Sequence, residues 1–396
     1  MSSQPNPERL VYLDHSATTP VRPEVLAAML PYFANKFGNA SSVHRWGYEA
    51  RQAINDAREK VASLIEASPN EILFTSGGTE SDNLAIRGVA HSRKAKGKHL
   101  ITSQIEHHAV LHTFEALQKE GFEVTFVPCD KYGLIDPDDI KRAIRKDTIL
   151  ISIMHGQNEV GTIEPIKDIG AIAREHGVLF HTDAVQSAGK VPIDVRDMNI
   201  DLLTVSSHKI YGPKGVGALY VRKGVRLVPQ VTGGAHERRM RAGTENVPGI
   251  VGFGEACRLA KADLPEESQR LANLRDKLIQ GILDKIPDVV LNGHPTLRLP
   301  HNVNVSVKYL EGESILLNLD RMGVAASSGS ACTSGSLEPS HVLLAMGLSH
   351  ETAHGSLRFT LGRSNTEEDI DYVLEVLPPI VEKLRSMSPL GPGSGL

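Results

Sequence analysis

Short apolar runs alternate with amphipathic segments through the first two thirds of the chain, and this alternation limits the possible folds more than any other feature. Seven of the runs predict β-strands, at residues 71–75, 99–103, 123–127, 148–154, 178–183, 201–206 and 217–221. Segments 81–95, 108–120 and 166–176 between them predict helices. Strands that alternate with helices at this spacing indicate an α/β fold with a mainly parallel sheet, which binds ligands at the carboxyl ends of its strands.

The last third of the chain has a different pattern. It predicts a long charged helix at 264–286, strands at 302–307 and 356–361, and a C-terminal helix at 367–385. With 396 residues the chain is too long for one compact core. We therefore expect a large domain over residues 17–260 and a smaller α+β domain built from residues 1–16 and 261–396.

Charge and hydropathy exclude several classes of protein. A formal net charge of −4 gives no electrostatic reason to expect nucleic acid or an anionic membrane as partner. The first residues, MSSQPNPERL, lack the features of a secretory signal, and no apolar run reaches the roughly 18 residues of a membrane span. We expect a cytoplasmic protein. Its three cysteines form neither a disulfide framework nor a metal-spaced cluster.

The motif SGGTESDN, residues 76–83, follows a predicted strand and opens a predicted helix. Its two glycines, the second of which is Gly78, let the backbone approach an anion closely. The free N–H groups at the start of the helix and the hydroxyl of Thr79 can then bind the anion. A glycine turn with a threonine cap is the alternative. No lysine follows the glycines, so the motif is not a Walker loop.

Two further strands end at ionisable side chains. Lys209, in SSHKIYGPKGVG, follows the strand at 201–206, where its amine could bind an aldehyde. A solvated surface lysine is commoner, but the neighbouring serines, histidine and glycines favour a site. Asp183 ends the strand at 178–183, which is the place for a partner of a protonated ring nitrogen, although the residue alone favours a helix cap.

Other motifs carry polar groups whose roles the residues alone leave open. In EHHAV either His107 or His108 could stack on an aromatic cofactor and move protons. Asn158, in HGQNEVG, could bind a substrate oxygen or form a turn. Arg358, in SLRFTLGR, could bind a carboxylate with two hydrogen bonds or form a structural ion pair.

Cys332 lies in AASSGSACTSGS, a stretch of small residues. A lone cysteine in such a loop is a candidate nucleophile, because no bulky neighbour anchors it in a core. Cys129 and Cys257 are interpreted as small buried hydrophobic residues.

In their order, these motifs resemble the cysteine desulfurases of the NifS/IscS type, in the class V aminotransferase family. The resemblance covers nearly all of the chain and is carried by YLDHSATTPV, FGNASSVHRWG, FTSGGTESDNLAI, EHHAVL, HTDAVQSAGK, SSHKIYGPKGVGALYVR, RMRAGTENV, GSACTSGSLEPSHVLLAMG and SLRFTLGR. It implies the aspartate-aminotransferase-like fold type I of pyridoxal-phosphate enzymes, with a seven-stranded, mainly parallel sheet in the large domain.

The resemblance also implies roles for individual residues. Lys209 forms the internal Schiff base with pyridoxal 5′-phosphate, Asp183 pairs with the pyridinium nitrogen, and His107 stacks on the ring. The cofactor contacts further include Gly78, Thr79, Ser206 and His208 around the phosphate, Gln186 at the ring hydroxyl, and Thr244 reaching the phosphate of the other subunit of a homodimer. Asn158 and Arg358 hold the substrate carboxylate.

The implied reaction takes sulfur from L-cysteine, leaving L-alanine and a persulfide on Cys332 that passes to an acceptor protein such as an iron–sulfur scaffold. Selenocysteine lyase and other lyases or aminotransferases of the same fold are the nearest alternatives. A sulfur-relay scaffold without catalysis is a further one, against which the intact Lys209 and Asp183 argue.

Overall fold

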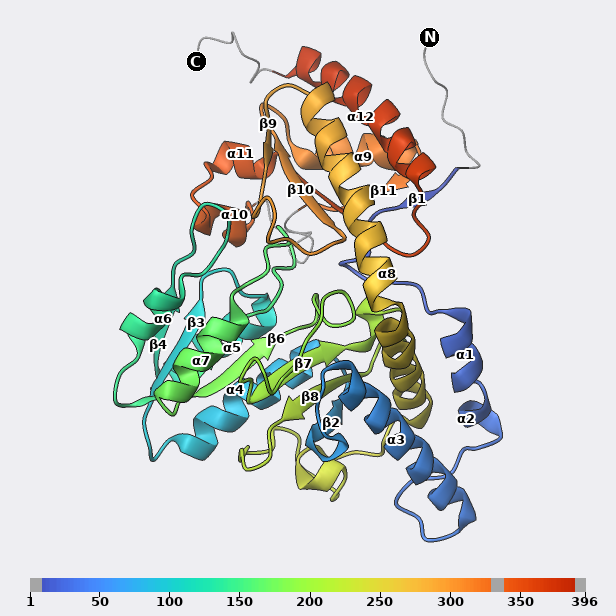
Figure 1. Ribbon diagram of the computed structural model, residues 1–396, viewed down its shortest axis with the longest axis vertical. Coiled ribbons are helices and arrows are strands. Elements are labelled where there is room, and N and C mark those ends of the chain that lie inside the picture. The colour runs from blue at the N-terminus through green and yellow to red at the C-terminus, as the bar shows by residue number, and fades with distance from the viewer. Residues whose placement is uncertain (1–8, 329–337, 389–396) are drawn as a thin grey trace.

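A computed structural model describes residues 9–328 and 338–388, in which one large sheet and two small ones are joined by helices (Figure 1). The large sheet has seven strands in the order β2-β8-β7-β6-β5-β3-β4. Their bounds are β2 Ile72–Thr75, β3 His99–Ser103, β4 Glu123–Val127, β5 Thr148–Ser152, β6 Leu179–Asp183, β7 Leu202–Ser206 and β8 Gly217–Val221. β8 runs opposite to the other six strands, so the predicted strands and the mainly parallel sheet are confirmed.

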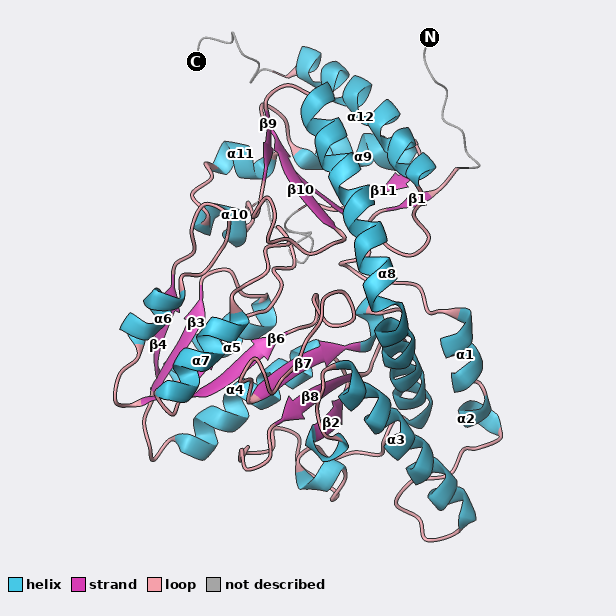
Figure 2. Ribbon diagram, viewed as in Figure 1, coloured by secondary structure: helices cyan, strands magenta, loops and turns pink. Residues whose placement is uncertain are grey.

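Helices cover both faces of this sheet (Figure 2). Side chains alternate along each strand: in β2, Leu73 packs in one cluster while Ile72 and Phe74 pack in another. The Leu73 cluster lies under α4 (Gly78–Arg93) and α5 (His108–Lys119). The Phe74 cluster is covered by α3 (Arg45–Leu64), α6 (Pro137–Ala143), α7 (Ile166–Glu175) and the first part of α8 (Val247–Lys285). Strands buried on both faces explain the continuous apolar runs in the sequence.

A separate apolar cluster surrounds the smaller sheets. One has the order β12-β10-β9, and β1 pairs with β11 in a parallel two-stranded sheet. The elements are β1 Val11–Tyr12, β9 Val289–Leu291, β10 Asn302–Val307, β11 Val324–Ala325 and β12 Ser356–Thr360, with α9 Gly312–Arg321 and α12 Glu367–Met387. Val11 and Leu13, near the N-terminus, lie in this cluster.

The remaining α-helices of the described residues are α1 Pro23–Met29, α2 Pro31–Ala34, α10 His341–Ala345 and α11 His350–His354. Val342 and Leu343 of α10 pack in the Phe74 cluster of the large sheet. We propose that the two bodies are domains divided near residues 16 and 260, with α10 reaching across the division. In the described ranges, no helix has the length and hydropathy that crossing a bilayer requires.

The long helix corrects one prediction. The sequence predicted a helix from 264, but α8 begins at Val247 and continues through Pro265 to Lys285. Glycine and proline are poor helix formers, so local propensity hid the first half. Close packing explains the glycines: a Cβ on Gly254 would lie 2.6 Å from Ala57 Cα on α3. In Figure 1, α8 runs from the large sheet to the sheet of β9, β10 and β12 and so links the two bodies.

The Gly254→Ala variant is expected to lose stability, because its Cβ would overlap the backbone of α3. Overpacking of this kind costs about 1–3 kcal/mol, which thermal unfolding would detect as a lower midpoint. Gly281→Ala, in the second half of the same helix, is the control, since the three atoms nearest its Cβ all belong to the side chain of Leu374 and none to a backbone. Equal midpoints for the two variants would contradict the packing of α8 on α3.

Candidate active site

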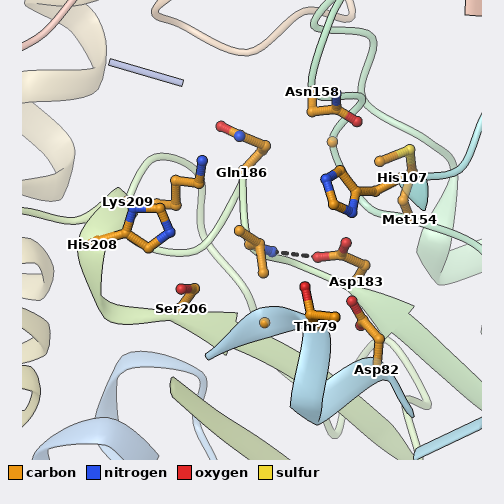
Figure 3. A pocket seen from close by; sticks show the side chains of 13 residues that line it. Thr79, Asp82, His107, Met154, Asn158, Asp183, Gln186, Ser206, His208 and Lys209 are labelled. Atoms are coloured by element: carbon orange, nitrogen blue, oxygen red, sulfur yellow. Dashed lines mark hydrogen bonds between the residues drawn. The ribbon is translucent and has the colours of Figure 1, made fainter. Parts of the chain in front are cut away.

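A pocket with an empty volume of about 690 Å³ lies where several strands of the large sheet end. Nine of the predicted site residues line it: Gly78, Thr79, His107, Asn158, Asp183, Gln186, Ser206, His208 and Lys209. Figure 3 shows Lys209 and Gln186 on one side of the pocket, His107 and Asn158 on the other, and Thr79 and Ser206 below.

The glycine motif forms one end of the pocket. The helix α4 begins at Gly78 directly after β2, and a Cβ on Gly78 would lie 3.0 Å from Val185 Cγ2. Thr79 and Ser206 both line the pocket and a hollow beside it, which Lys214 also lines. Helix-start N–H groups, two hydroxyls and a nearby lysine suit an anionic group such as phosphate.

The amine of Lys209 is held at the side of the pocket by backbone carbonyls. Lys209 lies in a 3-10 turn, Ser207–Lys209, that directly follows β7. Its Nζ donates to Ala17 O over 2.7 Å and also to Ser16 O. Next to it, burial and then the Lys209 charge lower the pKa of His208 to about 4. His208 is therefore neutral at neutral pH.

Asp183 is the last residue of β6, and its side chain is buried in the floor of the pocket. One carboxylate oxygen accepts from Val185 N over 2.8 Å (Figure 3). Burial raises the pKa of Asp183 to about 6, although this hydrogen bond and the charge of Lys209 act in the other direction. A carboxylate that is costly to bury in this way is stabilised by a cationic partner, which a protonated ring nitrogen would supply.

The structure chooses between the two histidines of EHHAV. His107 lines the pocket at the start of α5, and its Nδ1 accepts from Ala109 N over 3.1 Å. Burial, followed by the charge of Lys209, lowers the pKa of His107 to about 4. His107 is thus neutral, and the Nδ1 contact places its proton on Nε2. His108 lies away from the pocket and stacks on His112, with ring centroids 4.9 Å apart.

Arg358 comes from the other body and meets Asn158 at the mouth of the pocket. Its guanidinium donates to Asn158 O over 3.0 Å and to Asp14 Oδ1 over 3.1 Å. Arg358 is buried and does not itself line the pocket. Gln186, whose amide donates to Ser16 O over 2.9 Å, does line it. The structure therefore brings Arg358 beside the predicted residues rather than among them.

Two predicted residues remain. Thr244 is exposed and is not among the residues of this pocket. Cys332 lies outside the described residues, but the chain on either side is placed. Ser327 pairs with Arg358 through two backbone hydrogen bonds, and His341 Nε2 contacts Glu106 O at 3.0 Å. Both flanking segments therefore lie beside residues that border the pocket.

Sequence reasoning missed Asp82 and Met154, which also line the pocket. Asp82 is buried with 1% of its surface exposed. The sequence did hold a signal for it, since residues four apart share one face of a helix and Asp82 follows Gly78 by four. Met154 follows β5 in the same way as the other pocket residues follow their strands.

Comparisons with known proteins give matches over nearly the whole chain. The model of the aminotransferase class-V family matches residues 11–373. A cysteine desulfurase IscS of Methanosarcina thermophila is 62% identical over 384 residues, which cover 97% of this chain and 95% of that protein. One of Dictyoglomus turgidum is 57% identical, covering 96% and 97%.

Solved structures give the same result. A NifS-like protein superposes with a TM-score of 0.90 at 38% identity, covering 95% of this chain and 100% of that one. A structure described as SspA in complex with cysteine superposes with a TM-score of 0.79 at 42% identity, covering 89% and 98%. These likenesses show the fold type that the sequence predicted.

The lowered pKa of His107 predicts a pH effect on the ligand-free protein. A group whose pKa falls on folding contributes stability that is present above its unfolded pKa and is lost as pH falls through its folded pKa. For His107 that window runs from 6.5 down to about 4. When the pH is lowered from about 7 to about 5, the free energy of unfolding should therefore fall less in the His107→Asn variant than in the wild type.

Unfolding in urea at the two pH values measures this difference. His354→Asn, an exposed substitution at the end of α11, is the control and should follow the wild type. If His107→Asn and the wild type lost the same free energy of unfolding on acidification, the burial of a neutral His107 would be wrong.

Proposed function

Since the chain belongs to the aminotransferase class-V family, we propose that it is a cysteine desulfurase that holds pyridoxal 5′-phosphate in the pocket of Lys209. The observation that carries the proposal is the convergence of Lys209, Asp183 and His107 beside an anion cradle in one pocket. The relatives named cysteine desulfurase, and the neighbour solved with cysteine, support L-cysteine as the substrate.

The residues present fit this cofactor end to end. Gly78 leaves the space that a Cβ would fill at the phosphate end, and Asp183 offers a buried carboxyl with a raised pKa at the ring end. Lys209 presents an amine between them. When bound, the cofactor draws electrons from the bonds of the substrate amino acid and so weakens them.

Each residue has a task that its surroundings suit. Lys209 binds the aldehyde group, and the carbonyls of Ser16 and Ala17 aim its Nζ. Asp183 holds a proton on the ring nitrogen, because a cation beside it relieves the cost of its burial. His107 stacks on the ring, and as a neutral imidazole it can accept a proton.

The substrate carboxylate is proposed to bind Asn158 and Arg358. The Asn158 Oδ1 atom is buried without a hydrogen-bond partner among the described residues, whereas its amide nitrogen can donate. Arg358 already pairs with Asp14. A substrate carboxylate therefore has to share or displace this ion pair, which makes Asp14 a competitor for the arginine.

Cys332 is the proposed nucleophile. Its thiolate attacks the sulfur of L-cysteine, an S–S bond forms as the substrate C–S bond breaks, and the carbon product leaves as L-alanine after it gains protons. The resulting persulfide passes to an acceptor protein, such as an iron–sulfur scaffold. Ser327, before Cys332 in the sequence, pairs with Arg358, and His341, after it, contacts Glu106. These contacts beside the pocket support the role of the cysteine.

The other cysteines are poor candidates for the same task. Burial raises the pKa of Cys129 to about 12, and it raises the pKa of the fully buried Cys257 further. A thiol attacks as the thiolate, so neither would react readily at neutral pH. This agrees with their interpretation as small hydrophobic residues.

We also propose that the protein acts as a homodimer, in the cytoplasm. Large apolar side chains are exposed along α1, α2 and the start of α3: Leu26, Leu30, Phe33, Phe37, Val43, Trp46 and Tyr48. Monomers rarely expose so many together, and a second copy would cover them. In that dimer the exposed Thr244 is proposed to reach the phosphate in the pocket of the partner.

The Cys332→Ala variant should keep the visible absorption of the bound cofactor but lose release of sulfide from L-cysteine by at least about hundredfold. Lys209→Ala should lose both, because the amine that binds the cofactor is gone. Absorption spectra and sulfide assays separate these outcomes, and Cys129→Ala is the matched control. Normal turnover by Cys332→Ala would refute the role of the cysteine, and turnover of L-selenocysteine alone would favour a selenocysteine lyase.

Mixed dimers test the shared site. A dimer of one Lys209→Ala subunit and one Thr244→Asp subunit has one pocket with both substitutions and one with neither. Coexpression with two different affinity tags would isolate it, and it should recover about half of the wild-type activity, while each variant alone stays inactive. Failure to recover activity in a purified mixed dimer would mean that Thr244 does not act across the interface.

A further inference from the structure

A second buried carboxyl stands behind Asp183. Asp82, one helical turn into α4, lines the same pocket with 1% of its surface exposed, and Figure 3 shows it beside Asp183 and Thr79. Its Oδ1 atom accepts no hydrogen bond from the described residues. Buried carboxylates are normally paired or fully hydrogen-bonded, so this atom requires an explanation.

The groups that face Asp82 supply no positive charge. Two residues of β6 face Asp82, namely His181 and Asp183. The Nε2 atom of His181 lies 3.6 Å from Oδ1 of Asp82. From β7 the Thr204 hydroxyl donates a hydrogen bond to it, and Glu106, after β3, adds a third carboxyl nearby. Asp82 therefore has a hydroxyl, an imidazole and two acids around it.

His181 cannot provide the missing charge. Its Nδ1 lies 2.8 Å from Ser152 Oγ and its Nε2 lies 3.1 Å from Thr204 Oγ1, so hydroxyls occupy both ring nitrogens. Complete burial lowers the pKa of His181 to about 3. The neutral imidazole contacts Thr204, which in turn donates to Asp82. It therefore orients the Asp82 carboxylate but does not neutralise its charge.

Asp82 and Asp183 consequently disfavour each other's ionisation. Burial is the first cause of the raised pKa of Asp82 and the charge of Asp183 the second. Lys209 acts on Asp183 from the other side of the pocket. Two carboxylates in one desolvated site cannot both ionise cheaply unless a cation enters between or beside them.

We propose that Asp82 is a positioning residue of the cofactor site, which acts through Asp183 to favour a ligand that carries a positively charged ring N–H group. This rests on the proposed cofactor. The second carboxyl makes the ligand-free protein less stable, and the ring cation relieves that cost on binding, so part of the binding energy comes from the repulsion between the two acids.

A purely structural Asp82 would behave differently. If it only held Thr204 and α4 in place, Asp82→Asn would weaken the protein to a similar extent at every pH. In the proposed role the isosteric amide of the variant removes a charge that opposes folding. Acids with raised folded pKa values contribute stability at low pH that is lost as pH rises, so the variant should be the more stable one in alkaline buffer.

The experiment compares wild-type and Asp82→Asn proteins stripped of cofactor. Thermal unfolding from about pH 5.5 to about pH 8.5 should show a midpoint that falls more steeply in the wild type. Both proteins are then titrated with pyridoxal 5′-phosphate and with its analogue in which a C–H group replaces the ring nitrogen. The ratio of the two affinities gives the preference for the nitrogen-containing ring. This preference should be about tenfold smaller in the variant, the equivalent of one pKa unit.

Asp201→Asn is the matched control. Asp201 is another carboxyl whose pKa is raised by burial, but it lies at the far end of β7 and pairs with Arg222. Its substitution should leave the ring preference unchanged. Parallel pH curves together with an unchanged preference in Asp82→Asn would overturn the inference. Failure of the wild type to bind pyridoxal 5′-phosphate would instead refute the proposed function, since the pH curves of the stripped proteins do not depend on it.

Discussion

The segment of residues 13–19 connects the smaller body to Lys209, and the rest of the site depends on this connection. At one end, Leu13 is fixed in the smaller body, where its carbonyl accepts from Thr360 N over 2.7 Å. At the other end, the carbonyls of Ser16 and Ala17 accept from Lys209. Because strand pairing holds one end, these carbonyls cannot turn away from the lysine without breaking backbone hydrogen bonds. The two bodies and the reactive amine are therefore held in one arrangement.

Electrostatics give the pocket its chemical character. The carboxyls Asp82, Asp183 and Glu106 are buried together, while the neighbouring His107 and His181 have lowered pKa values and stay neutral. Lys209 supplies positive charge on only one side. A site of this kind is costly to fold, and functional sites often carry such costs. A ligand with an anionic group at one end and a cationic ring at the other complements it.

Periodicity located all seven strands of the large sheet. Six of them are buried along almost their whole length and so read as apolar runs, whereas β4, at the edge of the sheet, is only partly buried. It failed for the first half of α8, where several glycines hide the helix in the sequence and one of them, Gly254, is required by contact with α3. It could not choose between His107 and His108, since both stand at a helix start and only the backbone direction there aims one ring into the pocket. Asp82 was overlooked although helical spacing from Gly78 places it on the same face.

The order of motifs by itself determined the fold type, the strand ends that carry the site, and the residue types available there. Tertiary structure decided which of those residues meet. Arg358 contacts Asn158 from 200 positions away, and Asp82 faces Asp183 from a different element. Side-chain periodicity assigns a residue to a face of its own helix or strand. Its partner across that face depends on how separate elements pack, which no local pattern encodes.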